Sequence, residues 1–250
     1  MSRPTGNLFG WALALLGIAL FSSLGVWQLD RAHQKEAMLA EASTVLSARV
    51  PLPLSAASDP IRQTSHDWAQ GRGHFTSAPA VLLDNQGHQG RPGIRVFRVF
   101  QSEGSAVPLL VDLGWLPLPG DRRLPAIGSW QGPRSMAGLL APPPSAGIAS
   151  AVAVPQADGN LLVTSLDRAL LADALKLPAL SPRILRLDPA IRIGYARDLE
   201  LLPNTLPPER HLGYAVQWFG LALAVFVTAL VLTLRQRRRR QHAAREKITP

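Results

Sequence analysis

The stretch YAVQWFGLALAVFVTALVLTL, Tyr214–Leu234, contains no charged side chain and ends directly before Arg235. At a helical rise of about 1.5 Å per residue, a run of this length spans the roughly 30 Å hydrocarbon layer of a bilayer. A second uncharged run of similar length occupies Leu8–Trp27. The sequence therefore predicts two transmembrane helices, residues 8–27 and 211–234, near the two ends of the chain.

The net charge of +9 is concentrated behind the second helix, because residues 235–250 contribute +6 of it. Arg3 precedes the first helix, so the excess of positive charge on the cytoplasmic side predicts that residues 1–7 and 235–250 are both cytoplasmic. Residues 28–210 then form a periplasmic domain. A basic run beside an apolar helix is typical of contact with a lipid bilayer, and we expect no nucleic-acid partner.

The first apolar run has an alternative interpretation as a cleaved signal peptide, because it begins with a basic residue and has Ser22, Ser23 and Gly25 near its end. The sequence after Trp27 continues with helix formers and has no Gly or Pro until Pro51. This favours an anchor whose helix extends beyond the membrane surface. Only seven residues precede the apolar run, so we expect a bacterial inner membrane and not a mitochondrial import route.

The region between the helices predicts a β-rich fold, because short apolar runs alternate with Gly and Pro clusters. One amphipathic helix is expected at Asp167–Lys176, capped by Ser165 or Asp167, and residues 117–133 and 141–160 are expected to be long loops. The expected strands are Gln70–Phe75, Val81–Asn85, Ile94–Phe100, Val107–Leu113, Met136–Leu140, Leu161–Ser165 and Ile184–Leu187. The predicted fold class is a membrane protein of α+β type: two transmembrane helices flank a periplasmic, antiparallel and barrel-like β domain with one or two short helices.

Composition and motifs exclude several functional classes. The chain is 47% hydrophobic and only 17% charged, which argues against a disordered chain. It has no cysteine, which argues against a disulfide framework, a thiolate metal site and covalently attached haem. It contains no G-x-S-x-G elbow, no H-E-x-x-H and no glycine-rich phosphate loop. We therefore expect no enzyme, and the sixteen-residue tail is too short for a signalling domain.

His211 is a candidate ligand because it directly precedes the second apolar run. On a helix, His211, Tyr214 and Trp218 follow one another at i, i+3 and i+7, which places them on one face. An imidazole above two aromatic rings could ligate and stack a porphyrin at the membrane surface. The alternative is a polar interfacial residue beside an aromatic belt.

Gln28, Arg31 and Lys35 form a second candidate cluster, with spacings of three and four residues at the end of the first apolar run. They share a helical face and could bind anionic groups. The alternative is contact with lipid phosphates. Both clusters lie at the same outer surface in the predicted topology, so they line one site if the two helices pack together.

Two blocks at the ends of the apolar runs, LGVWQLDRAHQK and HLGYAVQWFGLA, and two blocks between them resemble the Surfeit locus family of cytochrome oxidase assembly factors. LGVWQLDRAHQK (Leu24–Lys35) and HLGYAVQWFGLA (His211–Ala222) resemble the family's entry and exit blocks, G-x-W-Q-x-x-R-x-x-x-K and H-L-x-Y-A-x-Q-W-F. VLLDNQGHQGRPGIRVF (Val81–Phe97) and LLVDLGWLP (Leu109–Pro117) stand where the family has a glycine-containing loop and a V-[ND]-R-G-W strand. Leu113 departs from that strand pattern, which usually has Arg at this position.

The resemblance implies an assembly factor for a haem-copper terminal oxidase that binds haem a transiently and assists its insertion into the catalytic subunit. It implies that His211 is the axial ligand of the haem iron. The family-type residues around it are Trp27, Gln28, Arg31, Tyr214, Gln217 and Trp218. The partners implied are the oxidase catalytic subunit and other oxidase assembly factors. The alternative function is a cofactor-free membrane scaffold that stabilises an oxidase subunit during biogenesis.

Overall fold

The computed structural model describes residues 5–145, 150–199 and 206–246. Arg3, the middle of the expected loop 141–160 and the last residues of the basic tail lie outside this described part. The chain divides into two compact units. One contains the residues up to Met38 and those from Leu206 onward, and the other is Leu39–Thr205.

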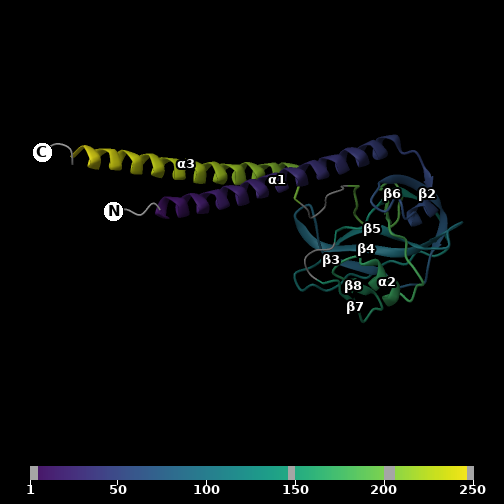
Figure 1. Cartoon of the computed structure of the whole chain (residues 1–250). Helices are drawn as coiled ribbons and strands as arrows, with labels where there is room; N and C mark the ends of the chain where they lie inside the picture. Colours follow the sequence, from purple (N-terminus) through teal and green to yellow (C-terminus); the bar gives the residue numbers. More distant parts are fainter. Residues whose placement is uncertain (1–4, 146–149, 200–205, 247–250) are drawn as a thin grey trace. The chain divides into compact units, whose positions relative to one another are not determined.

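The first unit is a pair of long antiparallel helices, formed by the amino-terminal part of α1 (Thr5–Ala48) and by α3 (Pro208–Glu246) (Figure 1). Helix α1 continues well past Trp27, as expected for a sequence without Gly or Pro before Pro51. Both helices are long and apolar enough to cross a membrane, by length and composition, over Leu8–Ala48 and Pro208–Arg239.

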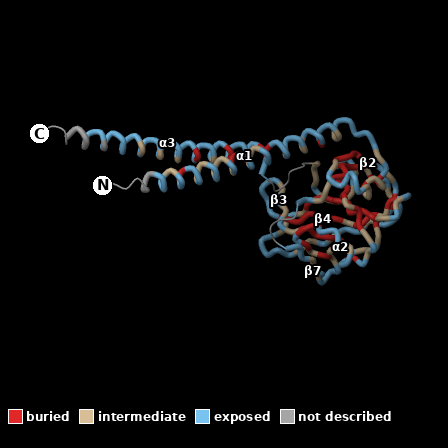
Figure 2. The backbone as a smooth tube through the Cα atoms, in the orientation of Figure 1, coloured by how far each residue is buried: buried red, intermediate tan, exposed pale blue. Residues whose placement is uncertain are grey.

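Much of the apolar surface of these two helices is exposed (Figure 2). Phe9, Leu16 and Val216 expose 73%, 68% and 72% of their surface. Two helices can bury only the stripe along which they touch, so the remaining apolar side chains must face outward. This surface suits a lipid environment, since in water it would cost roughly 25 cal/mol for each Å² that stays exposed.

The second unit is built on a mixed β-sheet with few helices. Its strand order is β1-β2-β6-β9-β5-β4-β3-β8-β7. The described strands are β1 (Leu52–Pro53), β2 (Asp67–Phe75), β3 (Val81–His88), β4 (Arg91–Ser102), β5 (Leu109–Pro117), β6 (Pro133–Ala141), β7 (Ala153–Pro155), β8 (Leu161–Val163) and β9 (Ile184–Leu187). Each of the seven runs expected from sequence thus forms a strand.

The prediction of a wholly antiparallel sheet is wrong, because β1 pairs in parallel with β2, β3 with β8 and β5 with β9. The short strand β9 lies between β5 and β6, parallel to the first and antiparallel to the second. A strand that reaches the sheet from a helix and a loop, not from a hairpin, can run in either direction. β2 also pairs with β4, so β2, β6, β9, β5 and β4 form a closed ring of hydrogen-bonded neighbours.

Both faces of the sheet are buried. On β3, Leu82 packs into one core cluster and its neighbours Val81 and Leu83 pack into the other, as expected for alternating side chains. The second cluster includes Leu171 of helix α2 (Arg168–Ala174). Asp167 caps this helix, because its side chain accepts a hydrogen bond from the backbone N–H of Leu170 at 2.8 Å. The expected helix and its cap at Asp167 are therefore present.

The connections between the strands agree with the sequence in part. β3 and β4 are joined by a tight turn in which Gln89 and Gly90 both have positive φ, 50° and 74°. Leu54–Ser58 forms the short 3-10 helix η1. The expectation that residues 141–160 form a loop throughout is wrong, since β7 lies within them and pairs with β8.

Leu113 is fully buried in the first core cluster. It lies at a bulge, because Val96 pairs with Gly114 and Phe97 pairs with Asp112. Gly114 has a φ of 112°, a conformation that favours glycine. An arginine side chain at this position would either bury its charge in the core or have to turn out of the core. Leucine is therefore matched to this apolar environment.

Candidate functional site

The two long helices meet along a seam of residues spaced alternately by three and four. The most buried seam residues are small, namely Ala14, Gly25 and Ala32 on α1 and Ala215 and Ala222 on α3. Alternate spacing of three and four keeps one stripe of each helix facing the other, and small residues let the backbones approach closely. A Cβ added at Gly25 would lie 2.7 Å from the ring of Phe219, which shows how close that approach is.

The end of the seam where α3 begins holds a polar pair. Nδ1 of His211 lies 2.7 Å from Oε1 of Gln28, across 183 positions of sequence. A carbonyl oxygen only accepts hydrogen bonds, so Nδ1 carries the proton and the bond fixes the imidazole tautomer. The lone pair of the neutral ring is therefore on Nε2.

Nε2 of His211 is enclosed and has no hydrogen-bond partner. The His211 residue is 8% exposed. Buried polar atoms in folded proteins nearly always have a partner, and leaving one unsatisfied costs about 1–3 kcal/mol. An unprotonated imidazole nitrogen held this way is the donor that a haem iron or another soft-to-borderline metal takes as a ligand.

Two cations lie near this imidazole. The charges that act on His211 come from Lys35 and Arg31. The ammonium of Lys35 donates a hydrogen bond to the backbone carbonyl of Leu206, which ties the entry of α3 to α1. Arg31 is exposed, with one guanidinium nitrogen 3.2 Å from Oε1 of Gln34. The charges that act on the His211 ring are thus positive and suit an anionic guest.

The aromatic residues of the predicted cluster have separate surroundings. Trp218 lies in the seam with its ring stacked on Phe21, at a centroid distance of 5.8 Å and an interplanar angle of 23°. Tyr214 lies beside the seam and is 40% exposed. Trp27 is half exposed, with the guanidinium of Arg31 5.8 Å from its ring centre. Of the aromatic rings, those of Trp27 and Tyr214 are open to a guest, whereas Trp218 is engaged in packing.

Gln217 is exposed on α3 and makes no described contact with His211. The structure therefore joins Gln28 directly to His211, places Arg31 near them and leaves Gln217 outside this group. The packing partners Phe21 and Gly25 were not identified from sequence. The signal that reveals them is the three-four spacing of small residues, which continues through both apolar runs.

The second unit also contains buried charged groups, and its described buried carboxylates each lie in an ion pair with an arginine. Burial raises the pKa of Asp67, yet hydrogen bonds from Arg62 and Arg183 outweigh it and hold this pKa below its ordinary value. Asp112 lies 2.9 Å from Arg95, with both side chains at most 6% exposed. Burial also lowers the pKa of His66, whose backbone N–H donates to Glu41 but whose ring Nδ1 has no hydrogen-bond partner. These groups fasten strands and helix ends together and have the character of structural pairs.

The fold and the site define a class of protein in which a β-rich domain separates two long apolar helices whose seam holds one unpartnered imidazole. The chain belongs to the SURF1 family, whose model matches residues 15–223. This is the Surfeit locus family that the end blocks resemble, and it is known as a family of cytochrome oxidase assembly factors. A search of curated proteins finds no match to the chain.

Proposed function

We propose that the chain holds haem a as transient cargo at the outer end of its helix pair and helps to insert it into the catalytic subunit of a haem-copper oxidase. The observation that carries this proposal is the enclosed, unpartnered Nε2 of His211. The hydrogen bond from Nδ1 of His211 to Gln28 leaves the lone pair of the ring on Nε2, the nitrogen proposed as the ligand. A single axial ligand suits a carrier, because the cargo must later be released.

The surroundings of His211 match the chemistry of this cargo. Haem a is apolar over most of its surface and carries two anionic propionates. Arg31 and Lys35 supply positive charge at the outer end, and Trp27 and Tyr214 supply exposed aromatic surface. Because Nε2 is enclosed, ligation requires the His211 side chain to turn outward or the seam to part at this end.

The proposal includes the location of the protein. We place the two apolar helices in the inner membrane of a bacterium, with both termini cytoplasmic and the β-rich domain periplasmic. The support is the basic run that begins at Arg235 within α3, together with the two candidate spans. The partners proposed are the oxidase catalytic subunit and other assembly factors, reached through the membrane and the periplasmic domain.

A cofactor-free scaffold is the second candidate function, and one observation favours it. A polar pair within a mostly apolar seam is also what fixes the register of two packed helices. In that case His211 and Gln28 would align α1 with α3 and bind no cargo. The helices and the β domain would then stabilise a folding oxidase subunit directly.

The test is the absorption spectrum of the detergent-purified full chain from cells that make haem a. We compare the wild type with His211→Ala and with His33→Ala, which removes an exposed histidine of α1. The carrier predicts a haem signal in the wild type and His33→Ala that is lost in His211→Ala. Unchanged haem in His211→Ala would remove this residue as the ligand. A colourless wild type that still restores oxidase assembly in a deletion strain would favour the scaffold.

A further inference from the structure

A groove of about 710 Å³ lies between α1 and α3 at the end of the helix pair far from His211. Its walls are almost entirely apolar and are formed by residues 10–20 of α1 and 221–236 of α3. It exists because Gly10, Ala14 and Gly17 leave the space beside α3 unfilled. Most of its lining lies outside the residues matched by the family model, 15–223.

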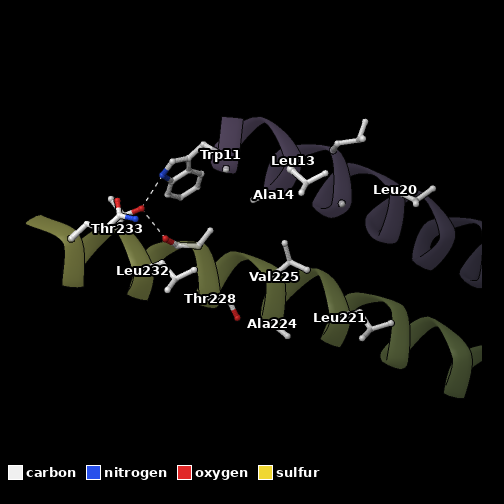
Figure 3. Close-up of a pocket in the computed structure, with 15 residues that line it drawn as sticks. Trp11, Leu13, Ala14, Leu20, Leu221, Ala224, Val225, Thr228, Leu232 and Thr233 are labelled. Atoms are coloured by element: carbon white, nitrogen blue, oxygen red, sulfur yellow. Dashed lines mark hydrogen bonds between the residues drawn. The ribbon is translucent and has the colours of Figure 1, made fainter. Parts of the chain in front are cut away.

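Most polar side chains of the groove lie at the end nearest the basic run, with Thr228 farther along the α3 wall. Figure 3 shows Trp11 reaching from α1 to Thr233 of α3, where its indole N–H donates to the hydroxyl at 2.9 Å. That hydroxyl in turn donates to the backbone carbonyl of Ala229 at 2.8 Å. Gln236 lines the same end. The groove is therefore mostly apolar along its length and polar at one mouth.

Two arginines continue the groove face beyond this mouth. At 100° per residue, Arg239 lies within about 20° of Leu232, which lines the groove, and Arg235 is within about 20° of Thr228. Arg237 and Arg238 lie on the opposite half of the helix by the same geometry. All four side chains are exposed. Residues 10–20 of α1 extend roughly 15 Å, about the depth of one bilayer leaflet.

We propose that this groove binds an anionic phospholipid of the leaflet beside the basic run, with one acyl chain along the groove and its phosphate at Arg235 and Arg239. The apolar walls match a hydrocarbon chain, and the cations at the mouth match the charge of the headgroup. A zwitterionic lipid has the same phosphate, but the cation of its headgroup weakens the attraction to the arginines. This inference rests on the membrane placement in the proposed function, but it does not depend on haem binding.

The test is native mass spectrometry of the full chain, purified in detergent and titrated with phosphatidylglycerol or with phosphatidylcholine of the same acyl chains. We expect preferential retention of phosphatidylglycerol. The double variant Arg235→Gln/Arg239→Gln should lower its apparent affinity by about tenfold or more. The charge-matched control Arg237→Gln/Arg238→Gln should lower it by less than about threefold. An equal loss in both double variants would overturn the proposed headgroup position.

A second pair of variants tests the groove itself. Gly10→Leu/Gly17→Leu adds side chains where an ideal Cβ meets nothing within 4 Å at Gly10 and only Val225, at 3.8 Å, at Gly17. It should abolish the retained lipid by filling the groove. Gly213→Leu/Gly220→Leu is the control, since these glycines of α3 also have nothing within 4 Å and do not line the groove.

The remaining outcomes separate this inference from the proposed function. Equal retention of both lipids, or a filled groove that retains phosphatidylglycerol, would overturn the lipid site while the haem experiment stands. A mass that equals two copies of the chain and excludes lipid would assign the groove to self-association. Recovery of the chain in the soluble fraction of lysed cells would instead contradict the membrane placement itself.

Discussion

Gln28 and His211 are joined by a side-chain hydrogen bond of 2.7 Å, although one lies on the first long helix and the other begins the last. The bond has two consequences. It fixes the alignment of the middle of α1 with the start of α3, and it leaves Nε2 of the imidazole without a partner in the described structure. Both the carrier and the scaffold functions depend on this pair, so its energetic contribution is the first quantity to measure.

Gln28→Leu should loosen the helix pair, because it leaves both polar atoms of the His211 ring buried without partners. The expected cost is about 1–3 kcal/mol, and Gln28→Leu/His211→Leu should recover most of it, since two apolar side chains can face each other. Opening of the helix pair can be measured with Ala215→Cys, because the chain has no other cysteine and Ala215 is a seam residue that is only 1% exposed. Maleimide should label this thiol roughly five- to a hundredfold faster in Gln28→Leu.

The control for this measurement is Gln34→Leu, which changes an exposed glutamine of α1 and should leave the labelling rate unchanged. If the double variant labels as fast as Gln28→Leu, the two residues do not act as a pair. If Gln28→Leu labels at the wild-type rate, the hydrogen bond contributes nothing to the packing of the helices. Either result would contradict the structural role given to Gln28.

Asp112 should be among the most costly charges to remove from the β domain. Its carboxylate accepts hydrogen bonds from Arg95 at 2.9 Å and from the backbone N–H of Gly114 at 3.0 Å. Asp112→Asn leaves the buried Arg95 without a countercharge, so we expect a loss of roughly 3–5 kcal/mol in the free energy of unfolding. Guanidinium denaturation of the full chain, followed by near-UV circular dichroism, measures this loss.

The matched control is Asp121→Asn. Its partner Arg123 lies at 3.1 Å, but the two side chains are 55% and 87% exposed. Removing an exposed pair should change the free energy of unfolding by less than about 1 kcal/mol. Equal effects of the two variants would show that burial of the Arg95 pair does not determine its contribution.

His66 predicts a specific loss of stability at mildly acid pH. Burial lowers the pKa of its imidazole from the ordinary 6.5, and the charge of Glu41 only partly opposes this. Below pH 6.5 the unfolded chain binds a proton that the folded chain resists, so the free energy of unfolding falls as the pH drops from 6.5 toward the folded pKa. The carboxyl of Asp67 acts separately, because its stabilisation is lost only below pH 3.8.

Replacing His66 by Gln should flatten this dependence between pH 7.5 and 5.5. The backbone N–H that donates to Glu41 at 3.0 Å remains in the variant. His74→Gln removes an exposed histidine of β2 and should leave the dependence as in the wild type. The quantity to measure is the free energy of unfolding of the full chain at several pH values. An unchanged slope in His66→Gln would contradict the role of the buried imidazole.

The sequence predicts the strands better than their pairing. Val81, Val96 and Leu110 lie in dense apolar runs bounded by Gly or Pro, and such runs identify buried strands locally. The parallel pairing of β9 with β5 depends on contacts between distant segments, which no local pattern encodes. β7 was missed because Ala153–Pro155 is short and ends in proline, which is typical of loops and sheet edges.

The sequence identified the two residues of the polar pair but not the contact between them. Gln28 and His211 were identified by their positions at the ends of the two apolar runs, and the predicted topology placed both at one membrane surface. The direct bond between them depends on the register of the two helices, which is set by seam packing. The same register turns Trp218 onto Phe21 and leaves Tyr214 exposed, so helical spacing alone overstated the aromatic cluster around His211.

The topology proposed for the membrane can be tested on this cysteine-free chain, because a single introduced thiol reports its own side of the bilayer. Glu103→Cys lies in the exposed turn after β4, and Gln241→Cys lies on α3 beyond the arginines. A membrane-impermeant maleimide added to intact spheroplasts should label the thiol of Glu103→Cys and not that of Gln241→Cys. Both should be labelled after detergent lysis, which controls for reactivity. The reverse pattern would place the β domain in the cytoplasm. It would contradict the prediction from the positive charge of the tail, which places the tail in the cytoplasm and the β domain on the other side.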